Sequence, residues 1–240
     1  MPRDIYATRR SLLILSAIYV AGCGFRSLLP MVDVPRICLH DTWVSRVVVG
    51  RSVATAAELA FVAQWALLLR EAGLAGEHSL ATRVSRLLVP LIVIAELCSW
   101  SAVLTTNNLL HASENSLWTV AAVLAIAGVV SIRPSLDDKG RRFATAAIIC
   151  GAVYVAFMTT IDIPMYLSRW QADLAAGRVY LSSSEGMHQI VQRCIVTRDW
   201  SSWRDDVAWI SLYFTAAVWI SIALAHVPPL RSPGHYHGSG

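Results

Sequence analysis

The chain has 240 residues, of which 55% are hydrophobic and only 15% are charged. Soluble domains average about 45–50% and 25% by comparable counts, so the composition excludes a disordered chain, a coiled coil and a small disulfide scaffold, and argues against an ordinary soluble domain. The formal net charge is +4, but the basic residues lie in short gaps between apolar runs, which argues against a nucleic-acid partner.

Six apolar runs follow one another along the chain, each close to the roughly 20 residues that a helix needs to cross a bilayer. They cover residues 11–31, 52–70, 87–106, 115–132, 143–164 and 207–228. A soluble protein can bury one or two such helices, but six leave too little polar surface for a soluble shell. We therefore expect an all-α fold, a single bundle of six transmembrane helices over residues 1–240, with the lipid bilayer as its partner.

The first run carries two patterns of exported proteins. Arg9 and Arg10 ahead of Ser11 are similar to a twin-arginine signal, and Val20–Cys23 is similar to a lipoprotein cleavage box. Because five further apolar runs follow, we expect an uncleaved first span.

The basic residues predict the orientation of the bundle. In the short segments, eleven Lys and Arg lie on the side of the N-terminus and four on the other side. Positive charge in short loops marks the cytoplasmic side, so both termini are expected inside, in a multi-pass protein of the inner or plasma membrane. Residues 166–206 then form a long segment outside the cytoplasm.

Two cysteines lie in the predicted outer segments. Cys38 follows the first run and Cys194 precedes the last one. In an oxidising compartment they could form a disulfide. The chain has no CxxC pattern, so a disulfide-exchange enzyme is not supported.

Two carboxylates interrupt the apolar runs. Glu58 lies in the second run and Glu96 in the third, roughly 10 and 15 Å below the outer surface at 1.5 Å per residue. Charged residues at such depth are paired or functional. The two spans run antiparallel, so both carboxylates are expected at similar depth in the outer half of the bundle.

Polar helix faces suggest a pocket around these carboxylates. The predicted ligand-binding residues are Glu58, Glu96, Arg51, Asn107, Asp162 and Arg26. Bundle packing would turn their faces inward together and leave a hollow open to the outside. In the alternative, Arg51 pairs with Glu58 and Glu96 pairs with Arg26, and both pairs only hold helices together.

A weaker pattern suggests a metal. His111 and Glu114 are spaced i, i+3 in an outer turn, and with His188 and Asp162 they could bind a divalent cation. The chain has no P-loop, Rossmann glycine pattern, HExxH or GxSxG motif, and no cofactor is indicated.

The leading functional hypothesis is a membrane protein that binds or transports a small polar or cationic ligand through an outward-facing acidic pocket. One alternative is a structural or assembly subunit, because the aromatic-rich segment 198–209 suits a protein interface. The other is an intramembrane enzyme on a lipid substrate, with Glu58 or Glu96 as general base and His111 or Asp162 assisting.

Overall fold

The computed structural model describes residues 3–192 and 194–227, and most of them are helical. The long helices are α1 (Arg3–Leu28), α2 (Val47–Ala75), α3 (Ser79–Thr105), α4 (Asn108–Ile132), α5 (Asp138–Phe157) and α8 (Trp200–His226). The shorter elements are α6 (Ile163–Ala175), α7 (Ser183–Gln192), β1 (Met31–Val32), β2 (Ile37–Cys38), β3 (Ile195–Val196) and the 3₁₀ turns Trp43–Ser45 and Arg133–Ser135. The prediction of an all-α helix bundle is confirmed.

Five helical stretches in the described residues are long and apolar enough to cross a membrane. They are Ala7–Leu28, Val47–Ala75, Ser79–Thr105, Asn108–Ser135 and Asp138–Ala175. The chain is therefore a multi-pass integral membrane protein. The sixth predicted span, 207–228, falls on α8, where Phe214–His226 is a shorter apolar stretch, and residue 228 lies outside the described residues. The sixth crossing stays a prediction.

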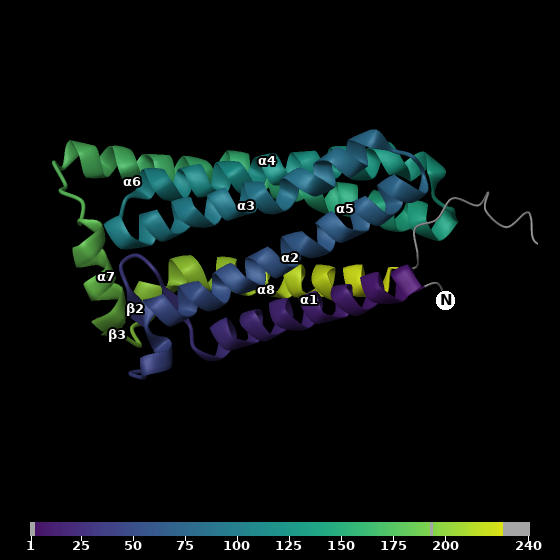
Figure 1. Ribbon diagram of the computed structural model, residues 1–240. Coiled ribbons are helices and arrows are strands. Elements are labelled where there is room, and N and C mark those ends of the chain that lie inside the picture. The colour runs from purple at the N-terminus through teal and green to yellow at the C-terminus, as the bar shows by residue number, and fades with distance from the viewer. Residues whose placement is uncertain (1–2, 193, 228–240) are drawn as a thin grey trace, which may run out of the picture.

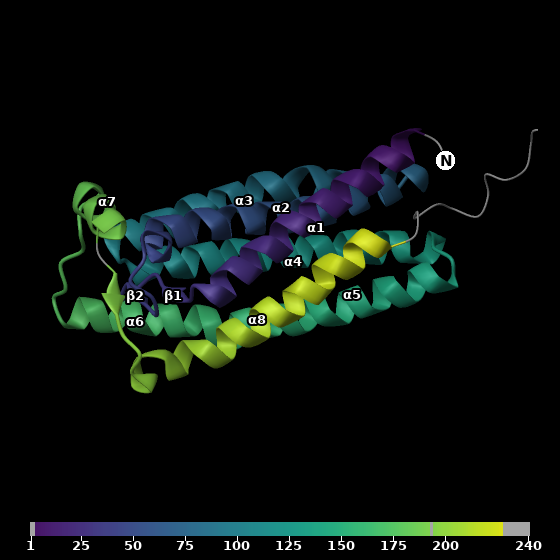
Figure 2. The same cartoon turned by 90° about the horizontal axis from the view of Figure 1, so that it is seen from below.

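The helices form two groups (Figure 1). Helices α3, α4, α5 and α6 lie in one group, α1 and α8 lie in the other, and α2 runs diagonally from one to the other. Helices consecutive in sequence pack together from α1 to α5, and α8 returns to pack on α1. The strands and α7 lie at the end of the bundle opposite the N-terminus (Figures 1 and 2). We call this the outer end, following the orientation that the basic residues predict.

The apolar core fills the half of the bundle nearer the N-terminus. Its buried residues come from most of the long helices and include Leu12, Leu68, Leu88, Ile92 and Leu224. Large apolar side chains also point outward from the bundle, among them Leu97, Val153 and Trp219. A bundle that is apolar both inside and outside is what a lipid environment allows.

Gln64 is buried in the middle of α2 and joins three helices. Its Nε2 donates to the carbonyl oxygens of Leu12 on α1 (3.1 Å) and Ser221 on α8 (3.2 Å). The Ser221 hydroxyl contacts Gln64 Oε1 at 2.7 Å and the Ser16 hydroxyl at 3.1 Å. This polar network ties α8 to α1 and α2, where small residues let the helices come close.

Replacing Gln64 by Leu is expected to lower the free energy of unfolding by about 1–2 kcal/mol, because the Ser221 hydroxyl loses a buried partner and the bonds to the Leu12 and Ser221 carbonyls are lost. Denaturant titration of the purified protein in detergent would measure the change. Gln171→Leu, at an exposed position on α6, is the control and should leave the titration unaltered. Equal stability of the two variants would contradict a stabilising role for the network.

Helices α5 and α6 are continuous through a π-helical turn, Met158–Asp162. The predicted span 143–164 lies within this longer helix, which runs from Asp138 to Ala175, and its bounds in the membrane stay a prediction. The predicted outer segment 166–206 consequently begins inside α6. Pro164 does not end the helix because it follows the π turn, where the regular i→i−4 hydrogen bonds are already interrupted.

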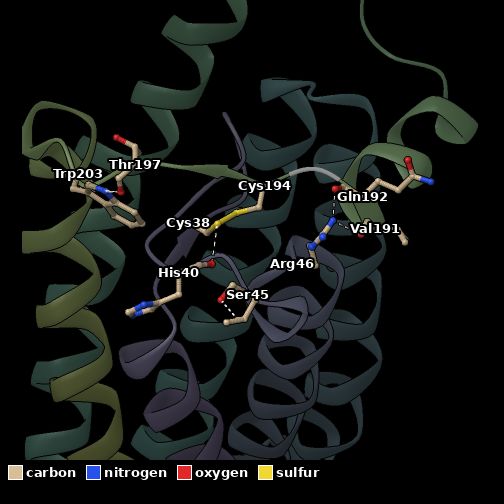
Figure 3. The surroundings of a disulfide bond; sticks show 10 residues. Cys38, His40, Ser45, Arg46, Val191, Gln192, Cys194, Thr197 and Trp203 are labelled. Atoms are coloured by element: carbon tan, nitrogen blue, oxygen red, sulfur yellow. Dashed lines mark hydrogen bonds between the residues drawn. A yellow bond between two sulfur atoms is a disulfide. The ribbon is translucent and has the colours of Figure 1, made fainter.

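A small cap closes the outer end (Figure 3). Cys38 in β2 is joined by a disulfide to Cys194, which directly precedes β3. Strand β2 pairs antiparallel with β1 and parallel with β3. The hypothesised bond thus links the loop between α1 and α2 to the segment that leads into α8.

Arg36 fastens this cap to the bundle. Its Nη2 donates to the carbonyl oxygens of Val103 (2.9 Å) and Leu104 (3.2 Å), and its Nη1 donates to Gln189 on α7. Carbonyls in the last turn of a helix such as α3 have no partner within the helix. Burial lowers the pKa of the Arg36 guanidinium, and the Asp33 carboxylate acts in the opposite direction. The loop that carries Asp33 is thereby held against α3 and α7.

Candidate functional site

Arg51 lies at the centre of an acidic cluster near the outer end of α2. Its Nη2 is 2.7 Å from Glu96 Oε2, 3.0 Å from Glu58 Oε2 and 3.7 Å from Glu114 Oε1. Only 7% of the Arg51 side chain is exposed. Because the three carboxylates come from α3, α2 and α4, one guanidinium joins three helices.

Glu96 is the most deeply buried carboxylate of the cluster, with 4% of its side chain exposed. Its Oε2 also accepts a hydrogen bond from Thr55 Oγ1 at 2.6 Å. Trp100 Nε1 donates to the same threonine oxygen at 3.0 Å. Thr55 follows Arg51 by one turn and Trp100 follows Glu96 by one turn, so the faces of α2 and α3 meet here. These contacts fix the position of Glu96.

The cluster holds more acidic than basic groups. One oxygen each of Glu58, Glu96 and Glu114 lie within 4.8 Å of one another. Asp33 adds a fourth carboxylate, with Oδ2 3.9 Å from Arg51 Nη1. One guanidinium cannot neutralise four ionised carboxylates. In a poorly solvated site the remaining negative charge has to be compensated by protons or by a bound cation.

The first turns of α4 extend the site toward α6. His111 Nδ1 lies 3.1 Å from Glu114 Oε2, and its ring centroid lies 5.0 Å from that of Tyr166. Asn115 Nδ2 donates to Asp162 Oδ2. Asp162 belongs to the π-helical turn, a feature frequent at functional sites.

A cavity of about 390 Å³ adjoins the cluster, within the usual size range of small-molecule sites. Four carboxylates line it, those of Asp33, Glu58, Glu114 and Asp162. Its arginine lining residues are Arg26, Arg51 and Arg169, and His111 also lines it. Its aromatic lining residues are Tyr19, Trp118, Tyr154, Phe157, Tyr166 and Phe214. Glu96 lies behind Arg51 and is not part of the lining.

Two of the six predicted ligand-binding residues, Asn107 and Glu96, do not line the cavity. Asn107 does not line the cavity; it is the N-cap of α4, where its Oδ1 accepts a hydrogen bond from Leu109 N at 2.9 Å. Arg26 lines the cavity, but Glu96 pairs with Arg51 instead of with it. The Arg51–Glu58 ion pair, which belongs to the interpretation that these charges only hold helices together, is present.

The suggested metal ligands do not come together as one group. His111 and Glu114 are adjacent, whereas His188 is exposed on α7 and does not line the cavity. Among the described residues, Glu58, Glu96 and Glu114 are the set with metal-ligand spacing. Arg51 Nη2 already occupies hydrogen-bonding positions between two of these carboxylates.

Sequence reasoning missed the role of Glu114 in the acidic cluster and the approach of Asp33. A signal for α4 was available, because His111, Glu114, Asn115 and Trp118 are spaced i, i+3, i+4, i+7 and share one helix face. No comparable signal marks Asp33, which lies in a loop and reaches Arg51 through the packing of the cap.

Comparison with protein-family models, with curated proteins and with solved structures gives no match.

Proposed function

We propose that this integral membrane protein binds a small ligand that carries a positive charge, in the cavity between α1, α2, α4 and α6. The observation that carries the proposal is the imbalance of charge around Arg51, where four carboxylates face one guanidinium. A ligand cation that reaches Glu58, Glu114 and Asp162 supplies the missing countercharge.

Aromatic rings support a cationic ligand. Tyr19, Tyr166 and Trp118 line the same cavity as the carboxylates. A ligand cation over the face of such a ring gains about 0.5–2 kcal/mol, most when it is desolvated. Carboxylates together with aromatic faces favour an organic ammonium group over a hydrated metal ion.

Binding is better supported than transport. Beyond the cavity, toward the N-terminal end, the helices close on the apolar core around Leu68, Leu88 and Ile92. A transporter would have to part these helices to open a second entrance. For the assembly alternative, the described side chains of segment 198–209 include an exposed Trp200, but Trp203 is buried and donates to Thr197 O at 3.0 Å.

Glu58 offers the most direct test, because it lines the cavity with 18% of its side chain exposed. Replacing Glu58 by Gln is expected to weaken the binding of small ammonium ions by about 10-fold or more, since one carboxylate contact to the cation is lost. Thermal unfolding of the purified protein, titrated with ethanolammonium, methylammonium and tetramethylammonium chloride, would measure the affinities.

Glu71→Gln is the matched control. Glu71 lies on the same helix but pairs with Arg9, 3.0 Å away, outside the cavity lining. It should leave the affinities unchanged, and sodium chloride at equal ionic strength should not reproduce the stabilisation. The proposal fails if none of the three ions stabilises the wild-type protein, or if both variants bind them equally well.

A further inference from the structure

We infer that a groove between α2 and α3, at the end of the bundle that carries the N-terminus, binds the phosphate of an anionic phospholipid. Two arginines of the groove, Arg70 and Arg86, hold the phosphate, while the acyl chains stay in the bilayer beside α3. The groove shares no lining residue with the cavity at the acidic cluster. The inference is therefore independent of the function proposed for that cavity.

The groove lies where α2 and α3 form a helical hairpin (Figure 1). It has a volume of about 400 Å³ and is lined by Ala66, Leu67, Arg70, Ser85 and Arg86. Arg70 lies about one and a half turns before the end of α2, and Arg86 lies about two turns after the start of α3. Because the two helices pack against each other and run antiparallel, the two arginines lie at nearly the same level of the bundle.

The charges of the groove are not compensated by the protein. Among the described residues, 3–192 and 194–227, neither Arg70 nor Arg86 takes part in an ion pair or a hydrogen bond. The acid next in sequence, Glu71, accepts from Arg9 Nη2 through both carboxylate oxygens, at 3.0 and 3.2 Å. No carboxylate lines the groove, so it offers two positive charges to a ligand.

The position of the two arginines in the membrane points to a phosphate. Both belong to helices that are long and apolar enough to cross a bilayer, and both side chains are exposed. A charged side chain there is costly unless it extends to the head groups or finds a partner. Two turns or less from the helix ends, the guanidinium groups reach the level of the lipid phosphates. The fork of N–H donors on arginine suits a phosphate, which it binds through two parallel hydrogen bonds.

The charge of the groove favours an anionic lipid over a zwitterionic one. A choline or ethanolamine head group would bring a further positive charge beside Arg70 and Arg86, where no lining carboxylate receives it. The exposed Arg83 lies one turn before Arg86 and adds to the positive field. This end of the bundle is also the one that the basic residues predict to be cytoplasmic, and the cytoplasmic leaflet carries the negative surface potential of anionic lipids.

An apolar surface next to the groove suits the acyl chains. Arg86, Pro90, Val93 and Leu97 are spaced i, i+4, i+7, i+11 and share one face of α3. The last three are exposed, so an apolar strip runs from the arginine along the helix toward the middle of the bilayer. A soluble phosphate would leave this strip unused, whereas the chains of a lipid bound at Arg86 cover it. The ligand is therefore assigned as a lipid.

Native mass spectrometry of the purified full-length protein, delipidated in detergent, tests the inference. Phosphatidylglycerol and phosphatidylcholine with the same chains are titrated separately, and the wild type should bind the first phosphatidylglycerol about 10-fold more tightly. Arg70→Gln and Arg86→Gln should each weaken phosphatidylglycerol about five-fold, which corresponds to about 1 kcal/mol for one basic residue near the membrane surface. The double variant should bind the two lipids alike.

Arg142→Gln is the matched control. Arg142 is exposed near the start of α5, at the same end of the bundle, and lies outside the groove lining. Its replacement removes the same charge and should keep the wild-type preference. Glu58→Gln should keep it too, because phosphatidylglycerol carries no ammonium group for the acidic cluster, and this separates the groove from the proposed function. All three arginines are exposed, so their variants are expected to fold, which their unfolding midpoints would verify.

Three outcomes would overturn the inference. An equal loss of phosphatidylglycerol binding in Arg142→Gln and Arg86→Gln would assign the binding to overall charge. Equal affinity of the wild type for phosphatidylglycerol and phosphatidylcholine would remove the selectivity for an anionic head group. Glycerophosphoglycerol, which lacks the chains, binding as tightly as phosphatidylglycerol would show that the source of the phosphate is not a lipid.

Discussion

Replacing Arg51 by Met is expected to lower the free energy of unfolding by about 3–5 kcal/mol, the usual cost of removing one partner from a buried charge network. The guanidinium is the only basic group among the described residues within 4 Å of Glu58 and Glu96. Without it, three carboxylates with oxygens within 4.8 Å of one another lose their countercharge. Thermal and denaturant unfolding in detergent would measure the loss.

The control for Arg51→Met is a variant that removes an arginine charge outside the acidic cluster. Arg70→Met on the same helix serves this purpose, because Arg70 is exposed, and its unfolding midpoint should stay close to that of the wild type. Adding Glu96→Gln to Arg51→Met should recover part of the stability, since one carboxylate is neutralised. An Arg51→Met protein as stable as Arg70→Met would show that the cluster does not depend on this guanidinium.

Removing the disulfide is expected to cost about 2–4 kcal/mol, because the bond restricts the unfolded chain over a sequence separation of 156 residues. Cys38→Ser, Cys194→Ser and the double variant should lose the same amount. A reductant should lower the unfolding midpoint of the wild type to that of the variants and should leave the variants unaffected.

Cys150 provides the control, because it is a free and exposed cysteine. Cys150→Ser should keep both the wild-type midpoint and its sensitivity to reductant. Alkylation of the denatured protein without prior reduction should label Cys23, Cys98 and Cys150 but spare Cys38 and Cys194. Labelling of all five thiols would contradict the bond.

The disulfide and the Arg51 cluster are linked through the cap, because the cap holds the loop that carries Asp33. Arg36 binds the last turn of α3, and the disulfide holds β2 beside β3. Both contacts restrain the loop that places Asp33 against Arg51. Loss of the disulfide is therefore expected to loosen the outer wall of the cavity as well as to destabilise the fold.

The amino-acid sequence by itself determined the class of the protein and indicated that its two central acids lie close together. Twenty-residue apolar runs have few alternatives to a membrane-spanning helix, because the bilayer core offers no hydrogen-bond partner to a non-helical backbone. Helical rise and period then place Glu58 and Glu96 near each other once their helices run antiparallel. In the structure both contact the same nitrogen of Arg51.

The tertiary structure alone decided which residues complete the site. Helical period places Asn107 near the outer end, but its position before α4 makes it a cap, whereas Glu114, two turns further along the chain, reaches Arg51. Asp33 and the π turn that carries Asp162 depend on how the cap and α6 pack. Local periodicity fixes a side chain relative to its own helix, while helix rotation, ion-pair choice and loop position are set by contacts between segments far apart in the chain.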